Sequence, residues 1–301
     1  DRKRAILRNE SLGRRLQAEW QLVDNATGQP VASRRSIIAT VPKLTDGGTF
    51  VQDGIEYTLA NQFRLLPGVY TRRKSTGETE SHVNTLPGQG VSHRYSLDPA
   101  KSVFKMEVGQ SSVPLLPVLR ALGATDDRLR EAWGDKLLAA NLPHDTPEAM
   151  SKLYDRLLNA TERKAEPDKV KAVAAAILKM KLDPAVTTRT LGRPHATLGV
   201  NAILDSTRRL LSVYRGEADP DDRDAMPYQK LMAPDDLMAE RIRAGRSTVR
   251  KLLWKATNKK SLAPLPTGLF DGHIKGLLQS SGLGNAVEEV NPTEMLGQLT
   301  R

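Results

Sequence analysis

The sequence predicts an α+β fold, and two observations carry that prediction. Through about residue 110, runs of alternating apolar and polar residues are separated by Gly, Pro and Asx residues, a pattern typical of strands and hairpins. From Thr125 to about Arg215, and again from Pro234 to Ala256, apolar residues recur at helical spacing. At 301 residues, the chain is long enough for two domains.

The first 70 residues predict a basic helix followed by two hairpins. Arginines and lysines gather in residues 1–22 on a stretch with helical content, which we interpret as a solvated basic helix in preference to a dedicated phosphate site. Leu22 to Thr40 then indicates strand, turn and strand, with the turn at residues 25–28. Between residues 49 and 59 the alternation is interrupted by Asp53 and Gly54, a pair that suits a tight two-residue turn.

The middle of the chain changes from strands to helices. A polar loop after Tyr70 is expected to lead to a β-rich run over residues 93–108, and residues 113–123 predict a short core helix with proline near its start. We interpret the apolar stripes between Thr125 and Arg215 as core surfaces. The acidic segment 217–224 favours a solvated loop over a magnesium site.

Pro234 to Ala256 predicts the longest helix of the chain. Its apolar residues form one stripe, and Arg243, Arg246 and Arg250 follow one flank about a turn apart. These arginines could face DNA phosphates or simply keep an exposed face solvated, and the sequence favours neither.

Composition limits the possible functions. The 45 Lys and Arg residues against 35 Asp and Glu give a formal charge of +10, which indicates a polyanionic partner, nucleic acid before membrane. No cysteine is present, which excludes disulfides and cysteine nucleophiles, and the five histidines lack the spacing of a zinc site. No apolar run approaches the length that crosses a bilayer.

Several motifs resemble a known family. Residues 48–50 (Gly-Thr-Phe), 53–54 (Asp-Gly), 61–64 (Asn-Gln-Phe-Arg) and 67–70 (Pro-Gly-Val-Tyr) are similar to a signature near the N-terminal end of the beta subunit of multisubunit DNA-dependent RNA polymerases. The family has His-Arg where this chain has Arg64 and Leu65, so the basic residue moves by one position. Residues 113–123 resemble the family's Leu-Pro-x-x-x-x-Leu-Arg-Ala-Leu. The divergence resembles that of a distant or phage-encoded member.

The last 29 residues resemble the family's fork region. Registered on residues 280–281 (Ser-Ser) and 291–292 (Asn-Pro), four positions correspond to family residues that line the fork beside the RNA–DNA hybrid and the rifamycin pocket. These positions are Asn285, Glu288, Gln298 and Arg301. Because the chain stops inside this motif, we expect it to be a fragment.

The resemblance implies a particular division into domains. Residues 1–71 and 229–276 would form one discontinuous mixed domain, the protrusion, and residues 72–228 would form an inserted, helix-rich second domain, the lobe. Residues 277–301 would begin the fork. The residues expected to bind nucleic acid are Arg64, Arg72, Arg73, Arg243, Arg246, Arg250 and Arg301.

The implied function is that of a non-catalytic N-terminal portion of the beta subunit, forming one wall of the DNA cleft during DNA-templated RNA synthesis. No catalytic residue, metal site or cofactor is expected in this chain, since the family's catalytic Mg²⁺ belongs to the beta-prime subunit. The implied partners are duplex DNA, the RNA–DNA hybrid, a beta-prime-type subunit and a sigma-like factor, without a membrane. The implied location is the cytoplasm, or the virion of a phage.

Two alternatives remain open. One is an autonomous DNA-binding or transcription-regulating protein derived from the beta lobes, and the other is a basic structural or virion protein without a polymerase role. Continuation of the reading frame into the rest of the fork would favour the polymerase subunit.

Overall fold

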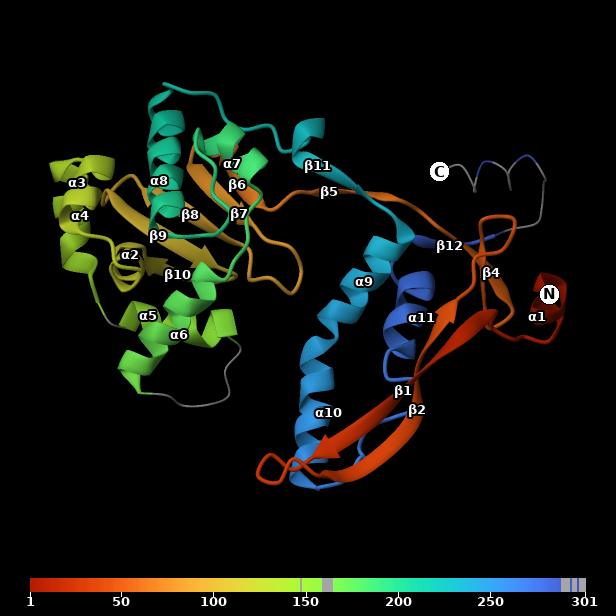
Figure 1. Cartoon of the computed structure of the whole chain (residues 1–301). Helices are drawn as coiled ribbons and strands as arrows, with labels where there is room; N and C mark the ends of the chain where they lie inside the picture. Colours follow the sequence, from red (N-terminus) through yellow and green to blue (C-terminus); the bar gives the residue numbers. More distant parts are fainter. Residues whose placement is uncertain (147, 159–164, 288–292, 294–296, 298–301) are drawn as a thin grey trace. The chain divides into compact units, whose positions relative to one another are not determined.

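The computed structural model describes residues 1–146, 148–158 and 165–287, together with Thr293 and Gly297 (Figure 1). Helices and antiparallel sheets make up the chain, which confirms the predicted α+β class. The chain divides into two compact units: unit 1 consists of residues 1–63 and 231–301, and unit 2 of residues 64–230. The domain limits implied by the resemblance, including a separate segment from residue 277, stay a prediction.

Unit 1 begins with a short helix and a long hairpin. Helix α1 (Arg2–Leu7) is followed by the antiparallel strands β1 (Gly13–Val23) and β2 (Pro30–Pro42). The helix expected over residues 1–22 is therefore wrong beyond Leu7, and Arg14 and Arg15 lie in β1. The physical reason is a period-two pattern in residues 16–22, which places Ala18, Trp20 and Leu22 on one face of the strand.

The hairpin around Asp53 is confirmed. Strands β3 (Phe50–Gln52) and β4 (Ile55–Leu59) pair antiparallel, and Asp53 and Gly54 both have positive φ, 49° and 77°. This is the backbone that a tight two-residue turn requires. Strand β12 (Gly284–Ala286) pairs with the other edge of β4, and Phe50 and Tyr57 pack with Leu278 in a small core.

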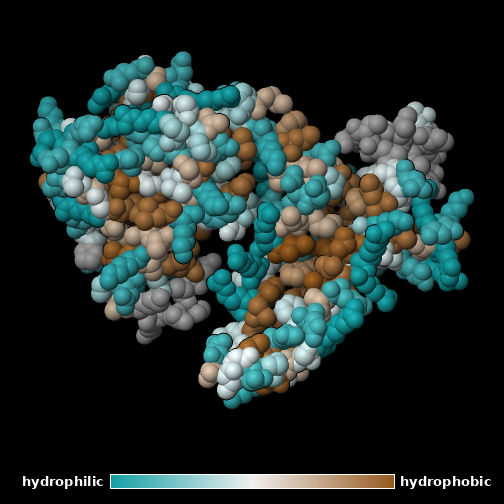
Figure 2. Space-filling model, viewed as in Figure 1, coloured by the Kyte–Doolittle hydropathy of each residue, from teal (hydrophilic) through white to brown (hydrophobic). Residues whose placement is uncertain are grey.

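The second segment of unit 1 contains α9 (Pro234–Ala244), α10 (Arg246–Asn258) and α11 (Asp271–Gln279). The single helix predicted over residues 234–256 is therefore wrong, because the chain breaks at Gly245. A Cβ at Gly245 would lie 2.2 Å from Nε2 of His273 in α11, so the absent side chain permits this close approach. Figure 2 shows apolar residues gathered over α9 and α11, which pack together.

Unit 2 is built on a five-stranded antiparallel sheet of order β10-β9-β8-β7-β6. Its strands are β6 (Gly68–Arg73), β7 (Thr79–Asn84), β8 (His93–Asp98), β9 (Val103–Val108) and β10 (Ser111–Pro114). The polar loop expected after Tyr70 is wrong, since Arg72 and Arg73 end β6. Strand β7 was not predicted, because its sequence is polar and places the buried carboxyl of Glu80 where an apolar residue would be expected.

Helices complete unit 2 and confirm the helical region predicted after Thr125. They are α2 (Leu116–Ala121), α3 (Asp126–Trp133), α4 (Asp135–Asn141), α5 (Glu148–Leu158), α6 (Glu166–Leu178), α7 (Pro184–Leu191) and α8 (Val200–Arg215), with 3₁₀ turns η1 (Leu142–His144) and η2 (Met226–Tyr228). The core combines sheet residues such as Tyr95 and Phe104 with helix residues such as Leu153 and Ile203. Strand β5 (Gln62–Leu65) pairs with β11 (Gln229–Met232).

Candidate nucleic-acid interface

Three of the predicted arginines lie on one exposed stretch of unit 1. Arg243 is in the last turn of α9, Arg246 begins α10, and Arg250 follows one turn later. All three side chains are exposed. None of them forms an ion pair with a carboxylate in the part of the chain that the structure describes. Their charge is therefore available to an anion from outside the chain.

The opposite side of α10 explains why this flank faces solvent. Leu252 and Ala256 pack with Trp20, Leu22 and Ala32 of the β1–β2 hairpin, and α10 lies along that hairpin in Figure 1. The guanidinium of Arg34 fixes the segment after α10, since its Nη1 donates hydrogen bonds to the carbonyl oxygens of Leu262 and Leu265, at 3.3 and 3.1 Å. The apolar packing thus determines the orientation of the basic flank.

Arg72 and Arg73 have partners inside unit 2. Arg72 donates to Oε1 of Glu80 at 2.6 Å, and Lys74 and Arg94 contact the other carboxyl oxygen at 3.2 and 3.4 Å. Arg73 donates to the carbonyl oxygen of Val213 at 2.7 Å. Both arginines stabilise the sheet, and their contact with nucleic acid stays a prediction.

The carboxyl of Glu80 is fully buried and would be costly without these cations. Burial would raise the pKa of Glu80, but the hydrogen bonds from Arg72 and Lys74 outweigh it and leave that pKa below its usual value. The cluster therefore keeps a buried negative charge compensated at neutral pH.

The remaining predicted residues are dispersed. Arg64 is half-buried in β5. Asn285 is exposed in β12, where its backbone oxygen accepts a 3.4 Å hydrogen bond from the Thr58 hydroxyl. Glu288, Gln298 and Arg301 lie outside the described residues. The predicted fork positions are thus represented here by Asn285 alone among the residues that the structure describes.

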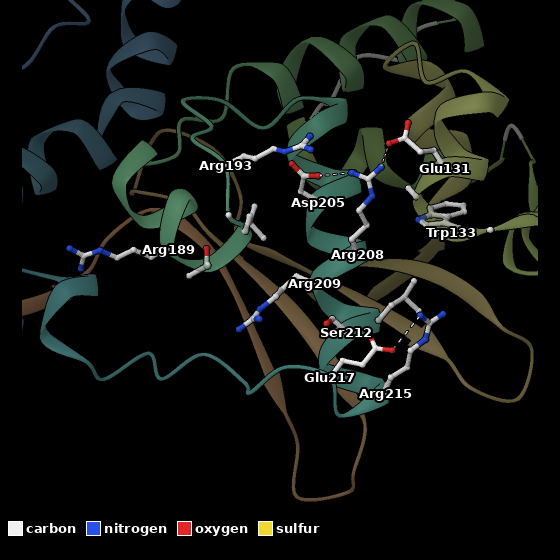
Figure 3. A pocket seen from close by; sticks show the side chains of 16 residues that line it. Glu131, Trp133, Arg189, Arg193, Asp205, Arg208, Arg209, Ser212, Arg215 and Glu217 are labelled. Atoms are coloured by element: carbon white, nitrogen blue, oxygen red, sulfur yellow. Dashed lines mark hydrogen bonds and ion pairs between the residues drawn. The ribbon is translucent and has the colours of Figure 1, made fainter.

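Unit 2 has an arginine-rich pocket that the sequence analysis missed. The pocket has a volume of about 830 Å³ and lies between the ends of α3 and α7 and the length of α8 (Figure 3). The pocket is lined by five arginines, which belong to α7, to the segment just after it, or to α8: Arg189, Arg193, Arg208, Arg209 and Arg215. Sequence reasoning interpreted this region only as core stripes, because the arginines are interspersed among the buried residues of α8.

Carboxylates pair with three of these arginines, Arg208, Arg215 and Arg209. Arg208 donates to Asp205 and to Glu131, each at 3.0 Å. Asp205 also lies 3.0 Å from Nε2 of His195, so one nearly buried carboxylate serves two partners. Arg215 is 3.8 Å from Glu217, a loose pair. These contacts fix the floor of the pocket.

Arg209 pairs with Asp221 of the acidic segment 217–224. The prediction that this segment is a solvated loop is therefore wrong at Asp221, whose carboxyl is largely buried. The carboxyl of Asp221 is 5% exposed, lies 3.0 Å from Nη2 of Arg209 and accepts a 2.7 Å hydrogen bond from the backbone N–H of Thr71. Burial raises the pKa of Asp221, although the bonds from Thr71 and Arg209 oppose that rise. The segment is therefore tied to β6 and α8.

Arg193 adds an uncompensated positive charge to the pocket, and Arg189 adds a second one at its edge. Both are exposed, and neither forms an ion pair with a carboxylate among the described residues. In Figure 3 the Arg193 side chain points toward Asp205, whereas that of Arg189 points away from the other labelled residues. The available chemistry is electrostatic binding of oxyanions such as phosphate.

The described residues contain no group of three or more His, Asp and Glu side chains arranged to hold a metal ion. Within the same residues, no helix combines the length and the apolar character that a bilayer crossing requires.

Comparisons with known proteins find no matching family model. Curated proteins named DNA-directed RNA polymerase subunit beta are similar to the chain: it is 23% identical over 309 residues to that of Gloeobacter violaceus and 24% identical over 313 residues to that of Synechococcus elongatus. Both alignments cover 93% of this chain and 27% of the relative. The protein of Alkaliphilus oremlandii is 29% identical over 178 residues, which are 56% of this chain and 14% of that relative. The chain thus spans about a quarter, or less, of the length of these relatives.

Proposed function

Since the chain is a divergent counterpart of a region of the RNA polymerase beta subunit, we propose that it belongs to a DNA-directed RNA polymerase and forms a non-catalytic wall of the cleft that holds the nucleic acid. The observation that carries this proposal is the row of exposed arginines at Arg243, Arg246 and Arg250, which have no carboxylate partner among the described residues. The chain that bears them is similar to proteins named DNA-directed RNA polymerase subunit beta. Phosphate groups are the ligands that such a row would bind without reading sequence.

Unit 2 supports the same role through a second surface. Its pocket presents Arg193, which has no carboxylate partner among the described residues, beside the fixed ion pairs of Arg208 and Arg209. The side chains in these ion pairs are already ordered, so binding a phosphate beside them costs little further conformational entropy. Both surfaces therefore offer charge rather than a reactive group.

Nucleotidyl transfer is assigned to a beta-prime-type subunit, which would hold the Mg²⁺. The other proposed partners are duplex DNA, the RNA–DNA hybrid and a sigma-like factor, and the proposed location is the cytoplasm. If the assignment is right, the isolated chain supplied with Mg²⁺, template and nucleotides makes no RNA. Templated synthesis by the chain alone would overturn it.

The direct test is duplex binding measured by fluorescence anisotropy as a function of salt. Replacing Arg243, Arg246 and Arg250 with alanine should weaken binding and reduce the slope of log K against log [salt] by up to about 2.7, that is about 0.9 for each lost phosphate contact. The matched control removes three exposed lysines of unit 2, K101A, K136A and K171A, which changes the net charge equally.

The two triple variants distinguish a specific surface from general charge. A larger loss in the arginine variant than in the lysine variant supports the proposal. Equal losses would mean that only net charge matters, and the α9–α10 arginines would then have no special place in binding.

A further inference from the structure

The exposed face of α10 carries an aromatic residue among its arginines. Trp254 is 65% exposed and Leu253 is 40% exposed, while Trp133 of unit 2 is 4% exposed. Spacings of three and four residues place Arg246, Arg250, Leu253 and Trp254 on the same side of the helix. We call these four residues, together with Arg243 at the end of α9, the α10 face.

Trp254 does not contribute to the folding core. Its neighbours Leu252 and Ala256 pack against the β1–β2 hairpin, but Trp254 itself lies outside that cluster. Within the described part of the chain, its indole makes no ring contact and its N–H donates no hydrogen bond. Tryptophan is enriched at interaction surfaces, because its ring contributes a large apolar area while its N–H remains free to donate.

The surroundings of Trp254 favour a polyanion that also has flat apolar faces. Arg250 lies one turn before it, and Lys251 and Lys255 are exposed beside it without ion pairs among the described residues. Thr257 and Asn258 limit the apolar area to two side chains, which is too narrow for the apolar stripe of a membrane-surface helix. Surfaces that bind single-stranded nucleic acid combine basic side chains, which contact the phosphates, with exposed aromatic rings, on which the bases stack.

Duplex and single strand differ in what they offer to an indole. In a duplex the base faces are stacked on one another, so cations can reach phosphates but the ring finds no free base face. In a single strand each base has an accessible face, and stacking adds to the phosphate contacts. Any preference of the α10 face for a single strand would therefore come from Trp254 and not from its arginines.

We propose that the α10 face binds single-stranded nucleic acid, with Trp254 stacked on a base and Arg243, Arg246 and Arg250 on the phosphates of flanking nucleotides. The inference rests on the proposed function, because that function assigns phosphate binding to the same arginines. It adds a ligand class, an unpaired strand, and a residue that recognises it.

The experiment compares two fluorescein-labelled probes, a 15-nucleotide oligo(dT) and a 15-base-pair duplex, on the 301-residue chain. Trp254→Ala should weaken oligo(dT) binding by roughly tenfold, within the range of base–aromatic stacking, and change duplex binding by less than about twofold. Trp254→Phe keeps a stacking ring and should restore most of the loss. Tyr214→Ala removes another exposed aromatic residue, at 46% exposure on α8, and should leave both affinities unchanged.

The outcomes separate this inference from the proposed function. If the triple arginine variant loses duplex affinity while Trp254→Ala binds oligo(dT) like wild type, the stacking role is refuted and the cleft-wall role stands. If the wild-type chain binds neither probe, both are refuted. If Trp254→Ala changes only the sedimentation of the free chain, the face is an interface between copies and not a nucleic-acid site. Because Trp254 is outside the core, thermal unfolding should show that every variant folds.

Discussion

The buried imidazole of His93 predicts a loss of stability in mild acid. His93 begins β8 and is 2% exposed. Its Nδ1 lies 2.9 Å from the carbonyl oxygen of Val91, which can only accept, so Nδ1 carries a proton, while Nε2 lies 3.0 Å from the Tyr95 hydroxyl, which can donate to it. Burial disfavours the charged imidazole, so the ring is neutral in the folded protein at neutral pH.

Burial lowers the pKa of His93 from 6.5 to about 4, and the nearby His82 adds to that decrease while the bond to Val91 opposes it. In the unfolded chain the ring takes up a proton below pH 6.5, but in the folded chain it stays neutral until about pH 4. Acid thus stabilises the unfolded state alone. The stability contributed by the neutral ring is complete above pH 6.5 and is lost as the pH falls toward 4.

The magnitude follows from the size of the shift. At 1.36 kcal/mol for each pKa unit, His93 should cost the protein about 2 kcal/mol of its free energy of unfolding between pH 7 and pH 4.5. Urea unfolding of wild type and His93→Gln at both pH values measures it. Since glutamine does not titrate, the variant should lose about 2 kcal/mol less than wild type over that interval.

Two results would refute this reasoning. Equal losses in wild type and His93→Gln would show that the ring does not titrate differently in the two states. Independently of any variant, the NMR signals of the His93 ring should keep their neutral shifts at pH 5.5 in the folded protein, and a midpoint near 6.5 would contradict the burial argument.

Three further predictions concern packing and charge. Gly284→Ala should destabilise the fold by about 2 kcal/mol or more, because a Cβ there would lie 1.9 Å from the backbone oxygen of Leu278, while Gly276→Ala in α11, with open space around it, should be neutral or stabilising in chemical unfolding. Gly54→Ala should cost about 1 to 3 kcal/mol in the same assay, since its φ is +77° and a Cβ would lie 2.7 Å from the Asn9 Cα; a loss near zero would contradict the turn geometry. Glu80→Gln should destabilise by about 2 kcal/mol at pH 7, because a neutral amide replaces the buried carboxylate that the partly exposed Arg72, Lys74 and Arg94 contact; the loss should shrink below pH 4.5, where the unfolded wild-type chain takes up a proton at this residue, and a loss independent of pH would argue against a charge effect.

Local rules predicted elements whose signals lie within a few residues. The pair of positive φ angles at Asp53 and Gly54 follows from the residue types, and the core helices follow from apolar spacing. The close approach of Gly245 to the ring of His273, which is 28 positions away in the chain, could not be predicted from local sequence. Strand β7 was missed for a similar reason: Glu80 is tolerated inside only because Arg72, Lys74 and Arg94 surround it.

The candidate surfaces also include one feature that the local sequence predicts and others that depend on tertiary packing. The arginines of the α9–α10 flank follow from helical spacing, which the sequence shows directly. The unit 2 pocket depends on bringing the ends of α3 and α7 to the side of α8, and no local pattern records that arrangement. The exposure of Trp254 likewise depends on which side of α10 packs against the hairpin.

The salt dependence of duplex DNA binding by the wild-type chain tests the central claim most directly. If exposed arginines on both units hold phosphates, log K should fall linearly with log [salt], with a slope steeper than about −2.7 for three or more phosphate contacts. A slope near zero, or no binding at low salt, would contradict the assignment of this chain as a cationic wall.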